Sequence, residues 1–202
     1  MKPLSFALIA AAVVTTMAFL AAPWQSARAI HASEAFPETG VFAGGCFWCI
    51  EADFEKLDGV GNVISGYSGG ALQNPTYKNH PGHIEVVEVP FDPDIISYRE
   101  LTDYFFRHVD PLDDGGQFCD RGHSYTTAIF YADETQRAIA EAAKADAELA
   151  LGETIVTPIR ALDQFWIAED YHQDYYKKNP VRYKFYRTGC GRDRRVKQVW
   201  GE

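Results

Sequence analysis

Apolar residues follow two different spacings along this chain, and each spacing predicts one kind of element. Runs rich in β-branched and aromatic residues, bounded by glycine, proline or asparagine, are typical of strands. Such runs predict strands at 39–43, 59–70, 84–91, 126–131 and 155–161. Apolar residues three and four positions apart are typical of helices that bury one face. This spacing predicts helices at 46–57, 97–108, 133–151 and 168–178.

Local signals place the ends of three of these helices. Gly44 and Gly45 predict a turn before the first helix, so that Cys46 falls at or near its N-terminus. Ser97 followed by Glu100 has the form of a capping box, which opens the second helix. Pro180 predicts the end of the last helix, because a proline has no N–H to continue it.

Helices alternate with strands, but some predicted strands follow one another directly. This order favours a single α+β domain with a mixed sheet and helices packed mainly on one face. We expect this domain to span 39–202, after a flexible linker at 30–38. The last 26 residues hold nine of the nineteen Lys and Arg residues. They are interpreted as a solvated basic tail, or alternatively as charges that tune Cys190.

The first 29 residues have the form of an export signal. Lys2 precedes an apolar run at 4–22, and Ala27-Arg28-Ala29 forms a cleavage site of the A-x-A type. We expect cleavage after Ala29 and a periplasmic mature protein. The apolar run is long for a signal, so an uncleaved membrane anchor is the alternative.

Composition excludes one partner and leaves the cysteines open. The formal charge of −9 argues against a general nucleic-acid surface. The chain has four cysteines: Cys46, Cys49, Cys119 and Cys190. In an oxidising compartment an even count is compatible with two disulfides. A chain of 202 residues does not need them to hold a core, so a chemical role stays open.

The run GGCFWCIEADF concentrates this chemistry. A cysteine at a helix N-terminus lies at the positive end of the helix dipole, which favours the nucleophilic thiolate. Phe47 and Trp48 add an apolar wall beside it. On these residues alone the two cysteines could be structural, as a bridge or as core residues. Three chemical alternatives remain beside that: a thioredoxin-like C-x-x-C oxidoreductase, a zinc site, and direct attack on an oxidised substrate. The zinc site would combine Cys46 and Cys49 with Cys119 and His123.

The same run resembles the signature of the type A peptide methionine sulfoxide reductases. The resemblance continues through SGYSGGALQNPTY, GHIEVVEVPFDPDIISY, DRGHSYTTAIFY and YHQDYYKKNP, in the family's order, and covers nearly all of 41–192. It implies a two-layer α/β sandwich and reduction of the S epimer of methionine sulfoxide, in proteins or free. It implies no cofactor and no metal. We expect a monomer.

The resemblance also assigns roles by position. Cys46 matches the nucleophile and Glu85 the acid, while Phe47 and Trp48 match the walls that hold the substrate methyl group. Tyr77 and Tyr125 match tyrosines that hydrogen-bond the sulfoxide oxygen, and Asp120 matches an acid that orders the site. These residue types suit the step, because a neutral carboxylic acid and phenol hydroxyls stabilise a departing oxygen.

A second thiol must then condense with the oxidised Cys46. We expect Cys49 to resolve it first, followed by a relay from Cys49 to Cys190. Cys119 has no role implied by the resemblance, and His83 and His172 are interpreted as structural. The resemblance implies regeneration by thioredoxin. For an exported chain we expect a thioredoxin-like reductant outside the cytoplasm.

Overall fold

The structure, a computed structural model, describes residues 36–201. The predicted export signal and most of the predicted linker lie outside these residues. The sheet has six strands in the order β7-β6-β1-β3-β2-β8. Their bounds are β1 Glu38–Gly44, β2 Ile64–Ser68, β3 Ile84–Phe91, β6 Thr127–Tyr131, β7 Ile159–Ala161 and β8 Phe165–Ile167. Only β6 and β7 pair in parallel, so the sheet is mixed as predicted.

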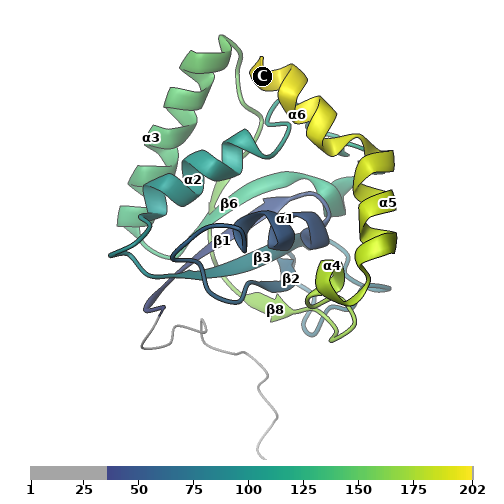
Figure 1. Ribbon diagram of the computed structural model, residues 1–202. Coiled ribbons are helices and arrows are strands. Elements are labelled where there is room, and N and C mark those ends of the chain that lie inside the picture. The colour runs from purple at the N-terminus through teal and green to yellow at the C-terminus, as the bar shows by residue number, and fades with distance from the viewer. Residues whose placement is uncertain (1–35, 202) are drawn as a thin grey trace, which may run out of the picture.

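Six α-helices accompany this sheet within the described residues: α1 Phe47–Phe54, α2 Tyr98–Arg107, α3 Glu134–Leu151, α4 Tyr175–Lys178, α5 Pro180–Cys190 and α6 Arg192–Trp200. Figure 1 shows α1 in front of the central strands, with α2 and α3 above and α5 and α6 along the right. The α+β class with helices mainly on one face is therefore confirmed. Among the described residues, no helix is long and apolar enough to cross a membrane.

Strand alternation decides which side chains meet the helices. In β3, Val87 and Val89 belong to the large core that the helices cover. Ile84 and Val86 belong to a smaller cluster on the opposite face, together with Val41, Ala43, Ala128, Phe130 and Phe165. Because side chains alternate between faces, Glu85 points to the helix side. It lies fully buried there, in a strand whose eight residues are all buried.

Two further elements carry residues of the site. A small hairpin pairs β4 Gly116–Gln117 with β5 Asp120–Arg121, and Phe118 and Cys119 form its turn. A short 3-10 helix, η1 His123–Tyr125, follows at once. The turn has only two residues, and Phe118 adopts a positive φ of 57° in it.

The C-terminal quarter differs from its prediction. Residues 168–174 are not helical, because they bond the first half of β2: the Gln173 side chain bonds both backbone groups of Ser65, and Ala168 N donates to Ser65 O. Helix remains only at α4. Pro180 begins α5 rather than ending a helix, since a first-turn proline needs no N–H partner. The predicted solvated tail is thus two helices.

Two predicted strands also need correction, and of the run at 59–70 only β2 is a strand. The run at 155–161 is a strand only at its end, in β7. Val156 N instead bonds Pro111 O, and Thr157 is buried against Thr127.

The capping box at Ser97 and Glu100 is present with both of its hydrogen bonds.

Candidate active site

The turn between β1 and α1 sets the position of Cys46. A Cβ on Gly44 would lie 2.4 Å from Ile50 Cδ1 of the following helix. Gly45 has a φ of +83°, and a Cβ there would lie 2.5 Å from Gln117 Cβ. Neither position accepts a side chain without displacement of its neighbours. The chain therefore folds sharply into α1, with Cys46 as the N-cap residue.

Cys46 and Cys49 are both buried free cysteines, and their sulfurs are hydrogen-bonded to each other. Burial raises the pKa of Cys46 well above its ordinary value. The hydrogen bond from Cys46 lowers the pKa of Cys49, and the charges of Arg192 and Arg187 lower it further. The predicted low pKa at Cys46 is therefore wrong for the free protein. Loss of water outweighs the helix dipole here, and the negative charge is favoured on Cys49.

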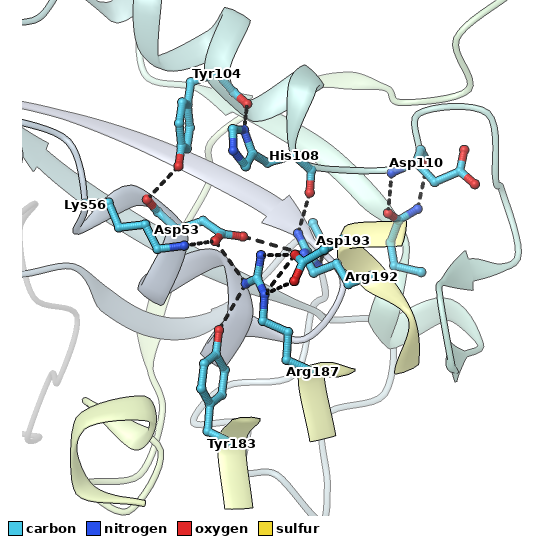
Figure 2. A network of polar contacts seen from close by, with 11 residues as sticks. Asp53, Lys56, Tyr104, His108, Asp110, Tyr183, Arg187, Arg192 and Asp193 are labelled. Atoms are coloured by element: carbon cyan, nitrogen blue, oxygen red, sulfur yellow. Dashed lines mark hydrogen bonds and ion pairs between the residues drawn. The ribbon is translucent and has the colours of Figure 1, made fainter. Parts of the chain in front are cut away.

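The two arginines belong to a polar network around Asp53, near the end of α1, drawn in Figure 2. Arg187 Nη1 lies 2.9 Å from Asp53 Oδ1, and Arg192 Nε lies 3.6 Å from Asp53 Oδ2. Burial raises the pKa of Asp53, but the charges of Arg192 and Arg187 hold it below its ordinary value. Arg192, only 2% exposed, also donates to the carbonyls of Gly44 and His108. The C-terminal helices thus fix the turn that presents Cys46.

Glu85 lies against the start of α1. Its Oε2 accepts a hydrogen bond from Phe47 N at 3.0 Å. Burial raises the pKa of Glu85 to about 8, even though this hydrogen bond opposes the rise. When Glu85 ionises, its negative charge raises the pKa of Cys46 further. A carboxyl group beside the sulfur is thus protonated at neutral pH and available as an acid.

Tyr77 comes to this point from the loop between β2 and β3, and Tyr125 from the end of η1. Their hydroxyl groups are hydrogen-bonded to each other, and Tyr125 also lies in the field of Glu85. Burial raises the pKa of Tyr125, so its hydroxyl stays protonated. Tyr77 is 38% exposed, and its backbone N–H donates to Glu169. The two predicted tyrosines therefore share one side of the site with Glu85.

Aromatic rings pack around Trp48 and His172 next to these groups. Trp48 stacks on Tyr175 with ring centroids 3.7 Å apart. Its Nε1 donates to Nδ1 of His172 at 3.1 Å, and the His172 ring also packs against Phe47 and Tyr77. Burial lowers the pKa of His172 to about 4, so this ring is neutral. The structural interpretation of His172 agrees with these contacts, although it orients residues of the site itself.

Asp120 meets a residue that the sequence analysis missed. The hydroxyl of Tyr186, on α5, donates to Asp120 Oδ2. The same hydroxyl is hydrogen-bonded to the sulfur of Cys46. Tyr186 lies in the segment interpreted as a basic tail, among eleven tyrosines in the chain. A helix predicted at 180–190 would have placed Tyr186 one turn before Cys190. That spacing is the one feature of the sequence that could have pointed to Tyr186.

The remaining cysteines are bonded to each other. Cys119, in the β4–β5 turn, and Cys190, at the end of α5, form a disulfide. Cys190 therefore has no free thiol to offer Cys49 here, and the relay to Cys190 stays a prediction for a reduced form. The zinc grouping with His123 is not brought together, because Cys119 is engaged with Cys190. The candidate metal-binding groups among the described residues are Cys119 with Asp120 and Cys190, and Glu51 with Glu55 and Asp174.

Comparison with known proteins gives consistent matches. A family model described as peptide methionine sulfoxide reductase matches residues 38–202. Peptide methionine sulfoxide reductase MsrA 2 of Rhizobium meliloti (strain 1021) is 54% identical over 175 residues, which are 86% of this chain and 88% of the relative. Its namesake in Caulobacter vibrioides is 52% identical over 169 residues, covering 81% and 86% of the two chains.

Solved structures agree in fold. Mxr1 from Saccharomyces cerevisiae in reduced form superposes with a TM-score of 0.67 at 32% identity, covering 71% of this chain and 86% of that one. Methionine sulfoxide reductase A of Corynebacterium diphtheriae gives 0.64 at 32% identity, covering 71% and 76%. Mxr1 in complex with Trx2 gives 0.50 at 23% identity, covering 72% and 89%, which is a likeness of fold.

Proposed function

This chain belongs to the peptide methionine sulfoxide reductase family, and we propose that its reduction of methionine sulfoxide proceeds through Cys46, with the S epimer as substrate. The observation that carries the proposal is the buried, protonated carboxyl group of Glu85 beside the start of α1. Sulfoxide sulfur becomes electrophilic only when its oxygen is stabilised, and a neutral acid supplies that stabilisation. A disulfide-exchange enzyme has no need of this group.

In the first step the Cys46 sulfur, as thiolate, takes the oxygen of the sulfoxide. Glu85 supplies a proton to that oxygen, and Tyr77 and Tyr125 donate hydrogen bonds to it. The methionine sulfur is reduced by two electrons and leaves as a thioether, while Cys46 is oxidised to a sulfenic acid. Phe47 and Trp48 hold the methyl group of the substrate on apolar surface.

In the second step Cys49 attacks the sulfenic sulfur. A Cys46–Cys49 disulfide forms and the oxygen leaves as water. The lowered pKa of Cys49 supports this order, because the attacking group is the thiolate. A thioredoxin-like dithiol then reduces the disulfide. Family membership supports this donor, and the structural neighbour Mxr1 has been solved with Trx2. The substrates are oxidised proteins and free methionine sulfoxide.

We further propose that the mature chain works outside the cytoplasm as a monomer. The signal-like sequence at 1–29 motivates this location. The Cys119–Cys190 bond supports it, because such bonds persist in oxidising compartments. Cell fractionation with the full chain tests it. We expect a periplasmic form that begins at Ile30, and a cytoplasmic full-length form would contradict the proposal.

The function is tested by one turnover without reductant. The parent chain, mixed with each epimer of methionine sulfoxide in turn, should release one methionine from the S epimer alone. Peptide mass spectrometry should then find a new Cys46–Cys49 disulfide. Cys49→Ser should still release methionine and leave a sulfenic acid at Cys46 that a cyclic 1,3-diketone traps. Cys46→Ser should release none. Rapid reduction of insulin disulfides without methionine release would instead support a general thiol–disulfide oxidoreductase.

A further inference from the structure

The sulfur of Cys46 has a hydrogen-bonding partner that the family resemblance did not supply. Cys46 is buried, and burial opposes its ionisation. The titratable groups that act on it come from three elements: Cys49 from α1, Glu85 from β3 and Tyr186 from α5. Cys49 disfavours the Cys46 thiolate through its hydrogen bond and its charge, and Glu85 disfavours it once the carboxyl group has ionised. Tyr186 alone among these groups favours the thiolate.

Tyr186 has one hydroxyl proton and two acceptors for it. One acceptor is Asp120 Oδ2 and the other is the sulfur of Cys46. While Cys46 is a neutral thiol, the charged carboxylate of Asp120 is the stronger acceptor. Once Cys46 ionises, its sulfur competes for the same proton. The hydroxyl can turn from one acceptor to the other without movement of the backbone.

A ring contact and a disulfide hold this hydroxyl in place. The Tyr186 ring meets Trp48 edge-on, with centroids 5.9 Å apart. Cys190 lies four residues after Tyr186 and so on the same face of α5. Cys119 directly precedes Asp120. The Cys119–Cys190 disulfide, with Cα atoms 4.8 Å apart, therefore ties the two elements that carry Tyr186 and Asp120 beside their point of contact.

We propose that Tyr186 is a further catalytic residue of this reductase, whose hydroxyl donates a hydrogen bond to the Cys46 sulfur as negative charge forms on it. Asp120 and the Cys119–Cys190 disulfide position that hydroxyl. Asp120 also competes with the sulfur for the proton, so the two residues act on Cys46 in opposite directions. The inference rests on the proposed role of Cys46, but its first test does not require sulfoxide.

The test uses Cys49→Ser as the background, without reductant, so that Cys46 is the only free thiol in the chain. The second-order rate of alkylation by iodoacetamide, followed against pH, reports the thiolate fraction of Cys46. Tyr186→Phe keeps the ring against Trp48 and removes the hydroxyl. It should lower the rate at pH 7 on the order of tenfold and move the midpoint of the profile to higher pH. Asp120→Asn should move the midpoint to lower pH.

The opposite signs separate this role from a structural one, since damage to the fold would move both variants in the same direction. Tyr176→Phe is the matched control, because its hydroxyl bonds Glu55, and its profile should equal that of the background. Circular dichroism confirms that each variant is folded. Equal profiles for Tyr186→Phe and the background, or a shift of the Asp120→Asn midpoint to higher pH, would overturn the inference.

A second measurement separates this inference from the proposed function. In the Cys49→Ser background, Tyr186→Phe should slow single-turnover release of methionine by the same factor as alkylation. If alkylation shifts while the background itself releases no methionine, the proposed function fails and the hydrogen bond stands. If methionine is released at the same rate with and without the hydroxyl, the catalytic role of Tyr186 is overturned.

Discussion

At the residue scale, two opposing effects set whether Glu85 keeps its proton. Burial raises the pKa to about 8, while the N–H of Phe47 favours the charged form. Burial is the larger effect, so the proton stays on at neutral pH. The folded state therefore holds a proton that the unfolded state, with a pKa of 4.5, has lost. This contribution to folding stability is full below pH 4.5 and declines as pH rises to about 8.

Glu85→Gln tests this residue. An amide accepts the Phe47 N–H as the carboxyl group does, but it has no proton to give the sulfoxide oxygen. Single-turnover reduction should fall by roughly 10²-fold or more at pH 7. The parent rate should also decline as pH rises past about 8, as Glu85 ionises, and the variant should lack that decline. Stopped-flow methionine release between pH 6 and 10 measures both. An unchanged rate, or the same high-pH decline in both chains, would contradict the assignment.

The predictability of the site also differs residue by residue. Glu85 was predictable because a carboxylate inside the β-branched run IEVVEVPF needs a reason, and the family motif supplies one. The pKa of Cys46 was mispredicted, because a sequence shows a helix N-terminus but not the loss of water around it. Tyr186 was missed because its partner Asp120 lies 66 residues away and is brought to it only by tertiary structure.

At the element scale, α6 works through Arg192. Arg192 is buried against Asp53 and donates to Gly44 O in the turn before α1. Removal of its charge leaves a buried carboxylate with less compensation and two carbonyls without their donor. Because Arg187 still pairs with Asp53, we expect the lower end of the cost of a broken buried pair.

Arg192→Met should therefore lower the free energy of unfolding by about 3 kcal/mol. Arg194→Ala is the matched control, two residues along the same helix, exposed, and expected to change it by less than about 0.5 kcal/mol. Urea denaturation followed by circular dichroism gives both values. Alkylation of Cys49 in a Cys46→Ser background should also move to higher pH in Arg192→Met. Equal stability of the two variants would show that the network contributes little.

The elements divide into those coded locally and those coded by partners. The capping box of α2, the alanine-rich α3 and the β-branched β3 each carry their own signal, and each was predicted to within one or two residues. The segment at 168–174 has a helical pattern, but its side chains bond β2 instead. Helices α5 and α6 were missed because charged residues dominate their surface pattern, while Arg192 buries its charge on Asp53.

At the scale of the whole molecule, the predicted α+β architecture was correct because the sheet order follows from strongly patterned central strands. The packing of the C-terminal helices against the first helix was not predictable. The chain returns to its first helix through α5 and α6, so the motif around Cys46 and these two helices form one site. The disulfide that joins Cys119 to Cys190 spans 71 residues of sequence, and only the fold brings its two cysteines together.

Loss of that disulfide should therefore affect both stability and the site. A cross-link that closes a loop of 71 residues restricts the unfolded chain, which stabilises the fold by about 4 kcal/mol. The double variant Cys119→Ala/Cys190→Ala should unfold at lower urea by that amount. A small dithiol should bring the parent down to the same midpoint and leave the double variant unchanged. In the folded double variant, Tyr186 is held by fewer constraints, so Cys46 alkylation in the Cys49→Ser background should slow at pH 7. If neither the dithiol nor the substitutions change the urea midpoint, the hairpin and α5 keep their places without the bond.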